Sequence, residues 1–89
     1  MTARYLLTKE VLHLTIRVPK NDAGYILHLL EARDNLCFPT TLPVESGVGW
    51  RDLLLRAPIE WESELRKFLN EIQKEIPISI TEDRVIKDD

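Results

Sequence analysis

The stretch that decides the fold is Val11-Leu12-His13-Leu14-Thr15-Ile16-Arg17-Val18. From Leu12 onward every second residue is apolar, and polar side chains stand between them. Successive side chains of a β-strand point to opposite faces, so this pattern predicts a strand with one buried and one open face. Pro19 directly follows the last apolar residue and ends the strand.

A helix is expected directly after this strand. Asn21 or Asp22 can cap its N-terminus, because short polar side chains accept hydrogen bonds from the free N–H groups of a first turn. Apolar residues then recur at the i, i+3, i+4, i+7 spacing of one helix face. The pattern predicts a helix over residues 22–33.

The remaining patterns predict two further strands, a helix and a short last strand. The segment 36–42 contains Pro39, which cannot donate to a sheet ladder and therefore belongs on an edge. The helix lies between Pro58 and Pro77 and has the strongest stripe in the chain. These elements are expected over residues 36–42, 50–57, 59–76 and 78–81, before a charged tail at 82–89.

The resulting order is βαββαβ, and right-handed crossovers leave few ways to assemble it. The ferredoxin-like arrangement is expected: an α+β sandwich with a four-stranded antiparallel sheet in the order 4-1-3-2 and two helices on one face. It places the strands that contain or follow Pro39 and Pro77 at the edges. The predicted core consists of Leu12, Leu14, Ile16, Val18, Ile26, Leu27, Leu30, Leu53, Leu55, Trp61, Leu65, Phe68, Leu69 and Ile72.

Length and composition bound the functional classes. The 89 residues fit one domain, with an N-terminal arm over residues 1–10, and the net charge is -3 with its basic residues dispersed. This balance, with one aromatic residue expected on the open sheet face, argues against nucleic-acid binding. Short apolar runs, the absence of a signal-like segment and a single cysteine predict a cytoplasmic protein that does not enter a membrane.

The junction Asn21-Asp22-Ala23-Gly24-Tyr25-Ile26 resembles the strand-to-helix junction of ACT-type regulatory domains, which share the βαββαβ order. The similarity extends loosely over residues 11–80, toward small uncharacterised bacterial proteins of ACT-like fold. It implies a ligand-binding site at Asn21, Asp22 and Gly24 for a small anionic or amino-acid effector, without a cofactor. The alternative is structural: Asp22 caps the helix and Gly24 eases its first turn.

Self-association is expected as well, since a domain this small gains stability by burying further surface. The two sheet edges and the apolar Tyr5-Leu6-Leu7 could supply a homodimer contact. The prediction is therefore a non-catalytic ACT-like regulatory or effector-binding module. The alternative is a protein-interaction or structural domain without a ligand.

The sequence gives less support to a function as an enzyme or as a metal-binding protein. Gly47-Val48-Gly49-Trp50-Arg51 resembles the phosphate-binding loop of acylphosphatases, but that loop follows the first strand and this one precedes the third. Acylphosphatase activity is thus a remote alternative. Cys37 and the two histidines fall on three separate elements, so no metal site is expected, and Cys37 is expected to be a small buried hydrophobe.

Overall fold

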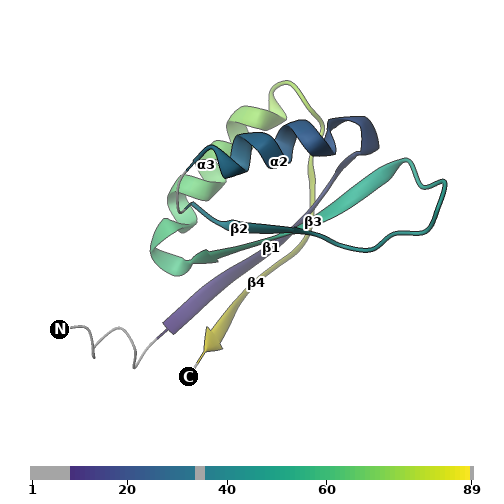
Figure 1. Cartoon of the computed structure of the whole chain (residues 1–89). Helices are drawn as coiled ribbons and strands as arrows, with labels where there is room; N and C mark the ends of the chain where they lie inside the picture. Colours follow the sequence, from purple (N-terminus) through teal and green to yellow (C-terminus); the bar gives the residue numbers. More distant parts are fainter. Residues whose placement is uncertain (1–8, 34–35, 89) are drawn as a thin grey trace.

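A computed structural model describes residues 9–33 and 36–88 (Figure 1). It has the predicted βαββαβ order, and a single turn of 3-10 helix leads into each α-helix. The predicted apolar arm at Tyr5 to Leu7 lies outside the described residues. The elements are β1 (Lys9–Pro19), η1 (Lys20–Asp22), α2 (Ala23–Glu31), β2 (Phe38–Thr41), β3 (Trp50–Pro58), η2 (Ile59–Trp61), α3 (Glu62–Gln73) and β4 (Ser79–Asp88).

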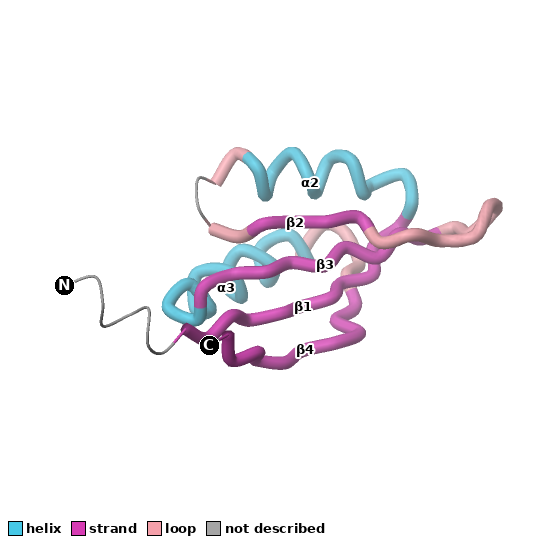
Figure 2. Tube along the Cα trace, turned by 60° about the horizontal axis from the view of Figure 1, so that its bottom comes forward, coloured by secondary structure: helices cyan, strands magenta, loops and turns pink. Residues whose placement is uncertain are grey.

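The four strands form one antiparallel sheet in the order β2-β3-β1-β4, which confirms the predicted ferredoxin-like topology. Figure 2 shows the strands side by side in this order, and Figure 1 shows both helices over the same face. The other face is open in the described part of the chain. The central strand β3 pairs with β1 along its full length, from Val11 opposite Pro58 to Pro19 opposite Trp50.

The core lies between the sheet and the helices. The alternation that predicted β1 is confirmed, since Leu12, Leu14, Ile16 and Val18 are all buried. Of the other predicted core residues, Leu27 and Phe68 pack only partly buried against the core. The fully buried large side chains are Leu12, Leu14, Ile16, Val18, Ile26, Leu30, Leu53, Leu55 and Leu65.

The prediction for Trp61 is wrong, because this side chain is 42% exposed. The chain after Pro58 first forms the 3-10 turn η2, and Trp61 occupies the N-cap position of α3. A 3-10 helix has three residues per turn rather than the 3.6 of an α-helix. Trp61 is therefore out of line with the buried face of α3, which consists of Leu65, Leu69 and Ile72.

The last strand is longer than predicted. Residues 82–88, which were expected to form a charged tail, are the second half of β4 and pair with β1 from Lys9 to Thr15. The register shifts between Thr15 and Ile16, because β4 has one extra residue there. Before the bulge the even-numbered residue Ile80 faces the helices, and after it the odd-numbered residue Val85 does. The residues on the helix-facing side therefore do not alternate regularly along the strand, and the sequence lacks the period-two pattern that would predict a strand of this length.

Candidate functional site

The predicted ligand site occupies the short connection between β1 and α2. Asn21 and Gly24 are exposed, and Asp22 is half-buried at the N-cap position of α2. The Asp22 side chain makes no cap hydrogen bond, so its predicted capping role is wrong. The connection is held instead through its backbone, where the Lys20 N–H donates to the Gly49 carbonyl at 3.0 Å.

Neither packing nor backbone conformation explains the glycine at position 24. A Cβ built on Gly24 would have no atom within 4 Å, and its φ is not positive. The structure thus places Asn21, Asp22 and Gly24 together on an accessible turn. The neighbouring group from another element, the Gly49 carbonyl, is already bonded to the backbone of Lys20.

The arginine at the end of the glycine-rich loop before β3 has a structural role. Gly47 has a φ of 85°, a left-handed conformation that glycine adopts without strain. The Arg51 guanidinium donates to the Val48 and Trp50 carbonyls at 3.1 and 2.8 Å. Arg51 therefore holds its own loop, which extends away from the sheet in Figure 1.

The open sheet face carries an ion pair between the two central strands. Arg17 donates from Nε and Nη2 to the two carboxylate oxygens of Asp52, at 2.9 and 3.1 Å, across β1 and β3. Its guanidinium also lies 4.6 Å from the ring centroid of Trp50. The hydrogen bond from Arg17 lowers the pKa of Asp52 below its usual value.

This pair predicts a small pH dependence of stability. Because the folded-state pKa of Asp52 is lowered, its contribution is present above the unfolded pKa of about 3.9 and is lost as the pH falls through the lower folded value. Asp52→Asn should therefore reduce the free energy of unfolding at pH 7 and make progressively less difference to it as the pH is lowered from 7 toward about 2. Urea titrations of both proteins at the two pH values would show this, and an undiminished difference at the acidic pH would contradict it.

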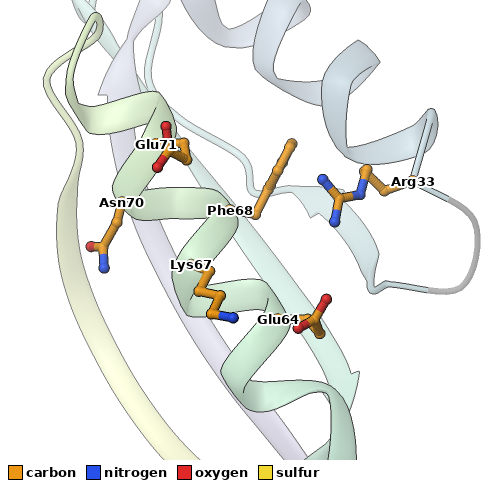
Figure 3. A pocket seen from close by; sticks show the side chains of 6 residues that line it. All are labelled: Arg33, Glu64, Lys67, Phe68, Asn70 and Glu71. Carbon is orange, nitrogen blue, oxygen red and sulfur yellow. The ribbon is translucent and has the colours of Figure 1, made fainter.

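A hollow of about 400 Å³ lies on the opposite side of the molecule, between the end of α2 and the outer face of α3 (Figure 3). Arg33 closes one side, with its guanidinium 5.0 Å from the ring centroid of Phe68. Glu64, Lys67 and Glu71 line the rest. Charges of both signs thus surround one partly buried ring, and this arrangement selects neither an anion nor a cation.

Cys37 behaves as the sequence predicted, as a small buried hydrophobe. It is a buried free cysteine, and desolvation raises the pKa of its thiol to about 11. A thiol with so high a pKa stays protonated near neutral pH and is a poor nucleophile. Within residues 9–33 and 36–88, no three His, Cys, Asp or Glu side chains gather as a metal site would require.

The fold and these surfaces define a small ferredoxin-like α+β domain. The chain belongs to the family described as Domain of unknown function (DUF4911), whose model matches residues 16–76. The matched segment runs from the middle of β1 through α3. No curated protein matches the chain, and no helix of its described part is long and apolar enough to cross a membrane.

Proposed function

We propose that this chain is a non-catalytic ACT-like module of the cytoplasm that works by binding, and that it forms a homodimer through the outer edge of β4. The observation that carries the proposal is the ten-residue length of this edge strand. A strand at the edge of a sheet presents unpaired N–H and C=O groups, which a second strand can satisfy. Ile80 and Val85 on β4 are 43% and 48% exposed, and pairing would cover part of them.

The two edges of the sheet differ in how well they can accept another strand. At the opposite edge, β2 has only four residues and contains Pro39, which lacks an N–H. Short strands and proline are the usual protections of an edge against pairing. β4 is longer and contains no proline, so it is the edge that favours association.

The charges along β4 support pairing with a second copy. Glu82 and Asp83 precede Arg84 and Lys87 along the strand. Opposed residues of an antiparallel pair share a face, so a symmetric register centred on Asp83 places Glu82 of one copy opposite Arg84 of the other, and one centred on Val85 places Asp83 opposite Lys87. Opposite charges across strands stabilise a ladder by a few tenths of a kcal/mol to about 1 kcal/mol for each pair.

A charge introduced at the edge tests this proposal. Light scattering should give the wild type twice its 10.4 kDa chain mass at micromolar concentration. Val85→Lys should give a mass near 10.4 kDa, because it places a cation where pairing would bury an apolar side chain. Tyr25→Lys is the matched control: Tyr25 is similarly exposed but lies on α2, and its variant should stay dimeric. A monomeric wild type would refute the dimer.

A second candidate function is the binding of a small anionic or amino-acid effector at Asn21, Asp22 and Gly24. The observation that favours it is the start of the helical segment at η1, where the Ala23 N–H already donates to the Lys20 carbonyl but neither N-cap residue, Pro19 or Asp22, satisfies the first N–H groups with its side chain. These groups and the positive end of the helix dipole attract a carboxylate, and the bare backbone of Gly24 permits close approach. An interaction domain without any ligand is the alternative.

Thermal shifts with amino acids separate these two possibilities, because a ligand that binds only the folded state raises its unfolding midpoint. Asp22→Asn should leave the stability of the free protein unchanged, since Asp22 makes no cap bond, and should abolish the shift if the carboxylate holds the effector amino group. The Cβ of Gly24→Val would have no atom within 4 Å in the free protein, and the added side chain should block binding. A ligand whose shift survives both substitutions would place the effector site elsewhere.

A further inference from the structure

A row of four side chains crosses the whole open face of the sheet. The register places Phe38 of β2 opposite Arg56 of β3, Arg56 opposite His13 of β1, and His13 opposite Arg84 of β4. Directly opposed residues of antiparallel strands point to the same face, about 5 Å apart. Because the neighbouring Leu12 and Leu55 point into the core, the row lies on the face that the helices leave open.

The row brings together groups that bind anions. Two arginines flank a histidine, and no carboxylate belongs to the row, although the chain as a whole carries a net charge of -3. An anion would meet the Arg56 guanidinium of β3 and the His13 imidazole of β1 together.

The nearby carboxylates leave one arginine of the row available. Asp52 already binds Arg17 through both oxygens, and Glu82 lies 3.2 Å from Nε of Arg84. Arg56 contacts the Thr40 hydroxyl at 3.4 Å and forms no ion pair with any of the described residues. The free guanidinium therefore lies beside Phe38, whose ring is 62% exposed.

We infer that this face binds a short single strand of nucleic acid, with its phosphates on Arg56 and His13 and one base stacked on Phe38. Exposed aromatic rings beside cationic side chains are the two components of single-strand binding surfaces, since every base has a face that stacks. An acidic peptide would use the arginines but would leave the exposed ring without a partner. The ring thus favours the nucleic acid.

A second aromatic residue on the same face extends the surface. Trp50 lies six residues before Arg56 along β3, about 20 Å away in an extended strand, with Arg17 above its ring. A strand of a few nucleotides would span both rings. The sequence predicts one aromatic residue on this face, and this together with the acidic net charge argues against nucleic-acid binding; the register adds Phe38 as a second aromatic residue.

This inference goes beyond the proposed homodimer and does not depend on it. Pairing of β4 edges extends the sheet in its own plane, so the open face stays accessible in monomer and dimer alike. Arg56 and Phe38 lie on β3 and β2, away from that edge. Substitutions there test nucleic-acid binding without disturbing the dimer contact.

Fluorescence anisotropy with a labelled oligonucleotide of about 12 nucleotides, as DNA and as RNA, tests the inference. We expect micromolar binding that weakens about 7- to 18-fold between 50 and 200 mM salt, as two or three phosphate contacts would give. Arg56→Ala and Phe38→Ala should each weaken binding about fivefold or more. Lys67→Ala on α3 removes the same charge from the opposite side of the molecule and should leave the affinity unchanged.

Three results would overturn the inference. One is the absence of binding by the wild type at low salt. Another is equal binding of a poly-glutamate peptide of the same charge, which would assign the face to an acidic protein partner. The third is equal weakening by Lys67→Ala and Arg56→Ala, which would mean that net charge alone decides. Arg56→Gln serves in place of Arg56→Ala if circular dichroism shows that the alanine variant is unfolded.

Discussion

Removal of residues 82–89 is expected to unfold the domain. Seven residues of β4, from Glu82 to Asp88, pair with residues 9–15 of the central strand β1. The net contribution of each ladder hydrogen bond is about 0.5–1.5 kcal/mol, so the loss over seven paired residues amounts to about 3.5–10 kcal/mol. The truncation also removes Asp83, which accepts hydrogen bonds from Arg66 of α3 at 3.0 and 3.1 Å. Small domains have total stabilities of about 5–15 kcal/mol, so little of the margin would remain.

A substitution that removes charge but keeps the strand is the control. Glu82→Thr combined with Arg84→Thr eliminates one exposed ion pair and retains a residue type that favours strands. Its stability should stay within about 1 kcal/mol of wild type, because exposed ion pairs contribute little. Circular dichroism and urea titration would measure both proteins. A truncated chain with wild-type stability would mean that residues 82–88 are a tail after all.

Leu65→Ala is expected to lower the free energy of unfolding by about 2–5 kcal/mol. Leu65 is 0% exposed and lies on the face of α3 that packs against the sheet. Its truncation removes buried methyl groups and leaves a cavity that the fully buried neighbours can fill only in part. Chemical denaturation gives the value directly.

Ser63→Ala on the exposed side of the same helix is the matched control and should change stability by less than about 0.5 kcal/mol. If Leu65→Ala had a denaturation midpoint near that of wild type, the core would not be centred on α3. Equal losses from both substitutions would instead point to helix formation, rather than core packing, as the step that is affected.

Periodicity predicted those elements whose pattern reflects burial on one face only. The alternation from Leu12 to Val18 located β1, and the stripe from Leu65 to Ile72 located α3, because a helix or strand must bury its apolar side. The same reasoning failed at β4, where the bulge near Thr81 shifts the buried positions by one residue. It failed at Trp61 because a 3-10 turn precedes the helix.

A feature of the molecular surface could be predicted from the sequence only where two of its residues lie opposite each other on strands that the topology makes neighbours. The Arg17–Asp52 pair follows from placing the two central strands side by side. The row from Phe38 to Arg84 required the register of all four strands, including the two edge strands that the sequence defines least well. The open edge of β4 likewise depended on the seven residues that resembled a tail.

Amide hydrogen exchange of β4, followed as a function of protein concentration, tests the proposed homodimer most directly, because it observes the edge itself. The N–H groups of β4 that do not bond to β1 should exchange quickly in dilute solution and become protected as the concentration rises through the dimerisation range. Alternate residues along β4 should show this protection, since only every second N–H points outward. Rapid exchange of these amides at every concentration would contradict the proposal that β4 pairs with a second copy.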